Sequence, residues 1–137
     1  MIYVFDASFV GALIIPDEKN PEVDKMRAKI GESDEIFTPQ LLWYEITNIL
    51  KNLIRRSRYT CDEVLQFFPQ MIAIRLTGDS ETGVEYSKKL LRLCNDYNLS
   101  SYDAAYLELA ERKRAVLCTI DERLRIAAKK HGVKVLR

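Results

Sequence analysis

The fold class is decided by the stretch AVLCTIDERLRIAAKKHGVKVL, residues 115–136. Its first part, Ala115–Ile120, is an apolar run with the length and composition of a strand that is buried on both faces of a sheet. The polar segment Glu122–His131 predicts a helix that ends at Gly132, and Val133–Leu136 predicts a further strand. Two strands separated by about 12 residues that include a helix form a parallel βαβ unit. This stretch therefore predicts an α/β protein.

The rest of the chain continues the alternation of short strands and helices. Strands are expected at Ile2–Phe5 and Glu35–Thr38. Helices are expected at about residues 8–14, 21–30, 39–57, 60–68, 80–97 and 101–113. No linker, repeat or low-complexity segment divides the 137 residues, which suit one domain. We expect a single α/β domain over residues 1–137, with a small parallel sheet of about four or five strands sandwiched by helices.

Two helices carry further local signals. Thr60 and Glu63 form a capping box that begins one helix, and Pro69 is expected to kink or end it. In the helix at about residues 80–97, the face predicted to point inward comprises Val84, Leu90, Leu91 and Cys94.

The composition excludes several classes of protein. Lys and Arg total 21 against 20 Asp and Glu, so the net charge of +1 provides no bulk positive field for non-specific nucleic-acid binding. Cys61, Cys94 and Cys118 form no CxxC pair and predict neither a disulfide framework nor a zinc ribbon. The longest apolar run, Phe9–Ile15, has seven residues, whereas a membrane span needs about 20. We expect a cytoplasmic protein without a membrane segment.

Four acids, Asp6, Glu45, Asp103 and Asp121, stand where the predicted elements favour apolar or neutral residues. Asp6 and Asp121 each end an apolar strand, so both are expected at the carboxyl edge of the parallel sheet, where such folds bind ligands. Glu45 follows Leu42 by three residues and so points with the apolar stripe of its helix, and Asp103 also shares a face with apolar residues. A buried carboxylate costs several kcal/mol unless a cation meets it. The pattern predicts a site for Mg²⁺ or Mn²⁺.

Each acid also has a purely structural explanation. Asp6 and Asp121 can cap the helices that follow them. Asp103 lies in a first helical turn, where the helix dipole favours an acid. Glu45 can extend its side chain to solvent or pair with a basic residue. The metal site is favoured because all four acids occur together in one small domain.

A local basic cluster lies at the end of the Glu45 helix and comprises Lys51, Arg55, Arg56 and Arg58. Such residues can hold the phosphates of a nucleic acid near a metal site. The alternative is a solvated helix end whose cations complement the helix dipole.

A metal site of this kind is suited to the hydrolysis of a phosphodiester bond. One or two divalent ions can supply the nucleophile from water and the positive charge that stabilises the leaving oxygen. The single histidine, His131, and the absence of a G-x-S-x-G motif leave no obvious catalytic triad. Asp6, Asp103 and Glu45 are expected to hold a first metal, with Asp121 contributing to a weaker second site.

Four segments carry a family resemblance: VFDAS (Val4–Ser8), LLWYEITNIL (Leu41–Leu50), SSYDAAYLELA (Ser100–Ala110) and LCTIDERL (Leu117–Leu124). Together they resemble the signature blocks of PIN-domain ribonucleases, in the family's order and spacing and over nearly the whole chain. Within that group they are most similar to VapC-type toxins of toxin–antitoxin pairs.

The resemblance implies a metal-dependent endoribonuclease whose metal-binding and catalytic acids are Asp6, Glu45, Asp103 and Asp121. It implies that Ser8 and Thr119 are hydroxyl side chains that flank the site, that Asn48 is a polar residue one turn beyond Glu45, and that Ser101 stands near a position where many relatives have threonine. It also implies an RNA substrate, a homodimer and a small cognate antitoxin that covers the active-site groove.

Other functions remain open from the sequence. A haloacid-dehalogenase-like phosphatase needs Asp-x-Asp after its first strand, whereas this chain reads Asp6-Ala7-Ser8. A non-catalytic PIN-like module that binds RNA or a protein would be expected to lack one or more of the acids, and all four are present. A metal-dependent DNA nuclease of related fold has the same pattern.

Overall fold

The computed structural model describes residues 1–137. The strands are β1 (Ile2–Phe5), β2 (Glu35–Pro39), β3 (Thr77–Asp79) and β4 (Val116–Cys118). The helices are α1 (Ala7–Ile14), α2 (Pro21–Ala28), α3 (Leu41–Arg55), α4 (Cys61–Leu65), α5 (Phe68–Ile74), α6 (Val84–Tyr97), α7 (Ser101–Arg112) and α8 (Glu122–His131), with a short 3₁₀ helix η1 (Pro16–Glu18).

The sheet is small and wholly parallel, with the strand order β3-β2-β1-β4. At its centre Val4 pairs with Phe37 on one side and with Leu117 on the other. Val135 adds a single parallel bridge to Leu117, so the expected terminal strand is reduced to one residue pair. The predicted α/β class and the four-stranded parallel sheet are confirmed.

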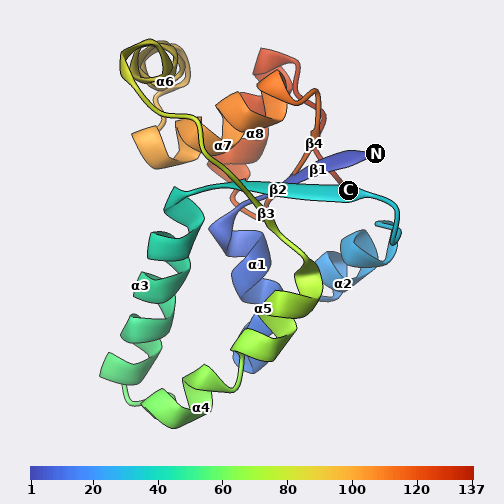
Figure 1. The fold of residues 1–137 in the computed structure, drawn as a ribbon, viewed down its shortest axis with the longest axis vertical. Helices are drawn as coiled ribbons and strands as arrows, with labels where there is room; N and C mark the ends of the chain where they lie inside the picture. The colour runs from blue at the N-terminus through green and yellow to red at the C-terminus, as the bar shows by residue number, and fades with distance from the viewer.

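Helices cover both faces of the sheet. In Figure 1, α6, α7 and α8 lie on one side of the strands, and α1, α2, α3 and α5 lie on the other. Because both faces are covered, the central strand has to be apolar on both sides, and Val4 and Phe5 of β1 are fully buried. The core continues into α7, where every residue from 104 to 110 is buried.

The structure corrects three details of the expected elements. Pro69 lies in the first turn of α5, where its missing N–H costs nothing, so it begins a helix and does not end one. Val84 and Leu91, expected to point inward, are largely exposed, and Leu93 takes the buried position on α6. Strand β3, with the sequence Thr-Gly-Asp, was not expected because it has no apolar residue.

An ion network fastens the edge strand β3 to the central helix α7. Glu108 of α7 is only 2% exposed and accepts from Arg112 at 2.8 Å. The same guanidinium donates two hydrogen bonds to Asp79 at the end of β3, at 3.1 and 2.6 Å. Arg112 thus neutralises a buried acid and a strand-end acid together, and it holds the pKa of Asp79 below its usual range.

None of the helices combines the length and the apolar character that a bilayer-spanning segment requires.

Candidate functional site

Asp6 is held at the carboxyl end of β1 by a dense set of donors. It is 4% exposed and caps α1, and its Oδ1 accepts from the Phe9 backbone N–H at 2.8 Å and from the Ser8 hydroxyl at 2.7 Å. Its Oδ2 accepts a hydrogen bond from the Thr119 hydroxyl. Burial nevertheless raises its pKa from 3.8 to about 6 against these three hydrogen bonds, and the charge of Asp121 contributes a further rise.

The β4–α8 connection brings the second strand-end acid to the same edge. Asp121 caps α8 and accepts from the Leu124 backbone N–H at 3.1 Å. The Asp121 N–H donates to the Thr119 hydroxyl oxygen at 3.0 Å, and the Ile120 N–H donates to the Ser8 hydroxyl oxygen at 3.2 Å. Ser8 and Thr119 therefore join the two strand ends, as their expected positions beside the site require.

Glu45 lies in the first half of α3 and is partly buried, pointing toward α7. Its Oε1 accepts from the hydroxyl of Tyr106 at 2.7 Å. Tyr106 is a fully buried residue of α7; burial raises the pKa of its phenol, and the hydrogen bond and charge of Glu45 and the charge of Asp6 raise it further. Burial also raises the pKa of Glu45, the Tyr106 hydrogen bond lowers it, and the charge of Asp103 raises it.

Asp103 lies in the first turn of α7, which Ser100 caps by accepting from the Asp103 backbone N–H at 3.1 Å. Partial burial raises the pKa of the Asp103 carboxyl, and the charge of Asp121 raises it further. The Ser100 hydrogen bond and the positive charge of Arg123, at the start of α8, act in the opposite direction.

The four acids form one electrostatic group. The charge of Asp121 raises the pKa of both Asp6 and Asp103, and the charge of Asp103 raises that of Glu45. Arg123 is the one cation whose charge opposes these rises, because it lowers the pKa of Asp103. A group of like charges gathered at a sheet edge with so little positive charge attracts cations.

The chemistry of the donors fits a hard divalent cation, because all four ligands offered are carboxylates. No three His, Cys, Asp or Glu side chains of the chain are grouped closely enough to hold one ion between them. Mg²⁺ is usually bound through one or two carboxylates and keeps several of its waters, so it does not require three grouped acids. The residues therefore fit the expected metal by donor type and charge.

Some expected site residues make no bond to the acids. Asn48 and Ser101 are exposed and make no side-chain hydrogen bond, and the cap expected of Ser100 or Ser101 is made by Ser100. The basic cluster lies at the opposite end of α3: Arg55 follows Glu45 by ten residues, or about 15 Å along the helix. Within it, Arg58 is already paired with Asp17 at 2.8 Å, while the others are exposed: Lys51, Arg55 and Arg56.

The sequence interpretation did not assign a role to two residues that the structure places in the group. Tyr106 follows Asp103 by three residues, so the helical period places both on the same face of α7. Its hydrogen bond to Glu45 joins residues 61 positions apart, which no local spacing in the sequence indicates. Arg123 is an exposed residue two positions after Asp121, and only the packing of α8 beside α7 brings its charge to Asp103.

Similarity to known proteins extends over most of the chain. The family model described as PIN domain matches residues 3–130. The chain is 28% identical over 124 residues to a protein from Pyrobaculum aerophilum named Ribonuclease VapC3, covering 90% of this chain and 92% of that protein.

Solved structures share the fold. The crystal structure of PAE2754 from Pyrobaculum aerophilum matches with a TM-score of 0.67 and 25% identity, over 93% of this chain and 87% of that one. The structure of VapBC2 from Rickettsia felis, bound to a DNA fragment from its promoter, matches with a TM-score of 0.65 and 14% identity, over 100% and 98% of the two chains.

Proposed function

Because the chain belongs to the PIN domain family, we propose that it is a metal-dependent endoribonuclease and the toxin of a toxin–antitoxin pair. One observation carries the proposal: at the carboxyl edge of the sheet, where parallel α/β folds bind ligands, the charge of Asp121 acts on Asp6 and Asp103, and the charge of Asp103 acts on Glu45. The name of the relative from Pyrobaculum aerophilum supports RNA as the substrate.

In this proposal Asp6, Glu45, Asp103 and Asp121 hold one or two Mg²⁺ or Mn²⁺ ions. Such an ion, when bound, supplies the activation of water and the charge that stabilises the leaving oxygen of the phosphodiester. Ser8 and Thr119 keep both oxygens of Asp6 oriented through their hydroxyl groups. Tyr106 fixes Glu45 in the same way by donating to its Oε1.

The cations near this group then position the RNA. Arg123 lies close enough to Asp103 to affect its carboxyl, so it is placed to contact a phosphate next to the cleaved bond. Lys51, Arg55, Arg56 and Arg58 would contact phosphates farther along the strand, because α3 carries them away from Glu45.

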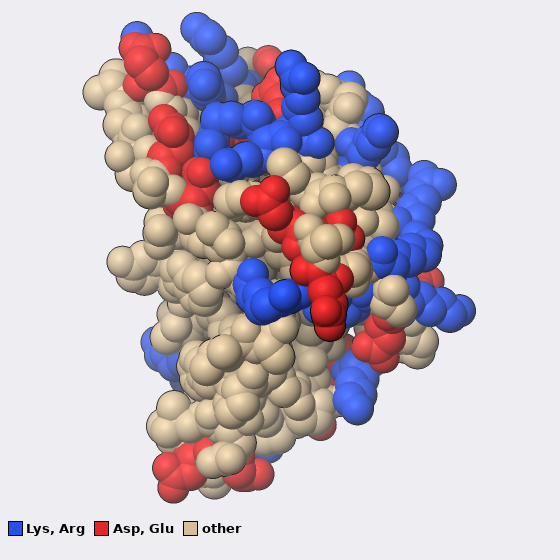
Figure 2. Space-filling view, turned by 45° about the vertical axis from the view of Figure 1, so that its right-hand side comes forward, with Lys and Arg blue, Asp and Glu red and all other residues tan.

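The partners proposed are a cognate antitoxin and a second copy of the chain. The VapBC2 complex provides the fold-level precedent for an antitoxin. For the homodimer, α3 and α5 present exposed apolar side chains, among them Trp43 at 38% and Ile72 at 76% exposure, beside a groove of about 550 Å³. In Figure 2 a broad area in the lower half of the face shown is largely free of charged residues, whereas charged residues gather over the upper and right-hand parts. Exposed apolar surface of this extent favours association.

Cleavage assays on structured RNA, single-stranded RNA and single-stranded DNA test the proposal. Wild type and Asp103→Asn are compared with Mg²⁺, with Mn²⁺ and with EDTA, and circular dichroism verifies that the variant is folded. We expect RNA to be cut only with metal and only by the wild type. Cutting of DNA in preference to RNA would instead identify a DNA nuclease, and a folded protein that is inert on all three substrates would favour the non-catalytic module.

A further inference from the structure

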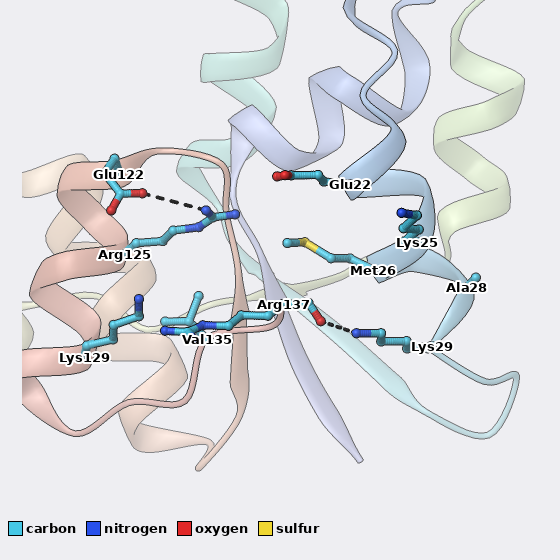
Figure 3. A pocket seen from close by; sticks show the side chains of 10 residues that line it. All are labelled: Glu22, Lys25, Met26, Ala28, Lys29, Glu122, Arg125, Lys129, Val135 and Arg137. Atoms are coloured by element: carbon cyan, nitrogen blue, oxygen red, sulfur yellow. Dashed lines mark hydrogen bonds and ion pairs between the residues drawn. The ribbon is translucent and has the colours of Figure 1, made fainter.

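A second, basic cavity lies between α2 and α8, outside the group of acids. Its volume is about 670 Å³, within the range of sites that bind small molecules. Figure 3 shows that α8 and α2 form its two walls and that the C-terminal segment lies between them. Its basic lining residues are Lys25, Lys29, Arg125, Lys129 and Arg137.

The charges in this cavity are unbalanced. Five cations line it against two side-chain carboxylates, Glu22 and Glu122. Glu122 makes a loose contact of 3.7 Å with Arg125, and Lys29 donates a hydrogen bond to the main-chain oxygen of Arg137. Lys25 and Lys129 are exposed and take part in no ion pair. A concave surface with excess positive charge concentrates its field and attracts anions.

Arg125 is the central cation of the cavity, and its guanidinium is only partly used by the protein. Its Nε donates to the Thr119 carbonyl at 3.2 Å, which fixes the orientation of the group. Its Nη2 is buried and has no acceptor among the protein atoms. In Figure 3 the side chain extends from α8 into the cavity toward Met26. A guanidinium held in this way is prepared to bind an oxyanion, because planar N–H donors match phosphate geometry.

The remaining surface of the cavity is apolar. Met26 is buried, Val135 is half-buried, and the side chain of Ala28 completes this part of the lining. Cations together with an apolar surface match a ligand that has a phosphate and a less polar part, as a nucleotide does, and they match inorganic phosphate less well.

One short segment links the cavity to the acids. Asp121 caps the helix whose first turn supplies Glu122 and Arg125 to the cavity wall. Thr119 donates its hydroxyl proton to Asp6 and accepts from Arg125 at its carbonyl. The Arg125 guanidinium is therefore separated from the Asp6 carboxylate by one residue, Thr119.

We propose that the α2–α8 cavity is a nucleotide-phosphate site that holds a nucleotide of the RNA strand adjacent to the one at the acids. This inference rests on the proposed ribonuclease function for its source of nucleotide. Free nucleotide is the other source of the same chemistry, and the experiment below separates the two.

The first arm measures the affinity of a labelled single-stranded RNA in EDTA by fluorescence anisotropy over a series of salt concentrations. Lys25→Glu/Lys129→Glu is compared with Lys19→Glu/Lys130→Glu, which makes the same change of charge at exposed lysines of the same region outside the cavity. We expect the cavity variant to bind at least about 10-fold more weakly than the control variant, with a shallower salt dependence.

The second arm follows the Arg125 Nε–H signal of the wild-type protein by NMR, during titration with the same RNA and with adenosine monophosphate. A shift caused by RNA, together with the affinity difference, supports the site on the RNA strand. A shift caused by the mononucleotide, with equal RNA affinity of the two variants, identifies free nucleotide as the ligand. Equal RNA affinities with no Arg125 shift by either ligand overturn the proposal.

These outcomes are separate from those of the ribonuclease proposal. A protein that cuts RNA with metal, but whose Arg125 signal and variants show no response, retains the proposed function and lacks the cavity site. A protein whose Arg125 signal moves with RNA, but which never cuts RNA, has the site without the nuclease.

Discussion

At the scale of single residues, Asp6 is an ionisable group whose burial in its charged form lowers the stability of the folded protein. Three donors hold its carboxylate, yet the pKa is raised to about 6 because burial outweighs them. A raised pKa means that the folded state favours the protonated carboxyl, so the stability from this group is present below about pH 4 and is lost as the pH rises through 6.

The first prediction follows from that sign. The rise of about two pKa units corresponds to at most about 3 kcal/mol, so Asp6→Asn should stabilise the metal-free protein by up to that amount above pH 6, with the gain shrinking toward pH 4. Urea denaturation in EDTA at pH 4 to 8 measures this, with the exposed Asp96→Asn as the matched control. Addition of Mn²⁺ should raise the Tm of the wild type and leave that of Asp6→Asn unchanged. A variant less stable than wild type at pH 8 would contradict the argument.

Tyr106 provides the second prediction. Tyr106→Phe removes the hydroxyl that donates to Glu45, which should cost about 1 kcal/mol of stability and raise the pKa of Glu45, since that hydrogen bond lowers it. Protonated Glu45 cannot hold a cation, so the rise of Tm with Mn²⁺ should fall more as the pH is lowered than it does at pH 8. Tyr102→Phe is the control, because Tyr102 is exposed on the same helix. An identical metal response in both variants would remove Tyr106 from the site.

At this scale the sequence predicted the four acids of the group but assigned no role to Tyr106 or Arg123. Asp6 and Asp121 were predictable because each directly follows an apolar strand, and parallel strands end at one edge. Arg123 was not predictable, because its proximity to Asp103 depends on how two helices pack and not on any spacing in the sequence. The basic cluster of α3 has a clear sequence signal, but the length of the helix separates it from Glu45.

At the scale of elements, apolar pattern and capping residues predicted most of the helices and strands. The capping box of Thr60 and Glu63 begins α4 as expected. Strand β3 escaped prediction because its position is set by pairing with β2 and by the contact between Asp79 and Arg112. The face of α6 was predicted inaccurately because that helix packs mainly against α7, which buries Leu93 and leaves Leu91 exposed.

The third prediction tests the link between β3 and α7. Arg112→Met leaves Glu108 buried without its cation, so the free energy of unfolding should fall by about 3 to 5 kcal/mol. Urea denaturation measures the loss, with Arg92→Met, at an exposed position of α6, as the control. Arg112→Met/Glu108→Gln should recover part of the stability, because the uncompensated buried charge is then gone. Equal stability of Arg112→Met and the control would show that the network contributes little.

At the scale of the whole molecule, the acids and the exposed apolar side chains draw partly on the same element. The acids lie where α1, α3, α7 and α8 meet the ends of β1 and β4. The exposed apolar side chains of α3 and α5 include Trp43, Phe68 and Ile72. Helix α3 therefore contributes to both surfaces.

The fourth prediction concerns the apolar surface. Ile72→Glu places a charge in the apolar groove, so a homodimer that uses α3 and α5 should be weakened. Sedimentation equilibrium should give a dimer dissociation constant at least about 10-fold higher than that of the wild type. Ile126→Glu is the matched control, because Ile126 is also exposed but lies on α8. Two variants that dimerise equally well would place the interface outside the groove.

The bond between Thr119 and Asp6 joins residues 113 positions apart, and Asp121 comes later still in the chain. During synthesis Asp6 is therefore made long before its orienting hydroxyl and its strand-end neighbour. A chain still growing on the ribosome cannot assemble this site until β4 and the start of α8 have emerged. For an enzyme proposed to cut RNA, the order of synthesis then delays activity until the segment around Thr119 and Asp121 has been made.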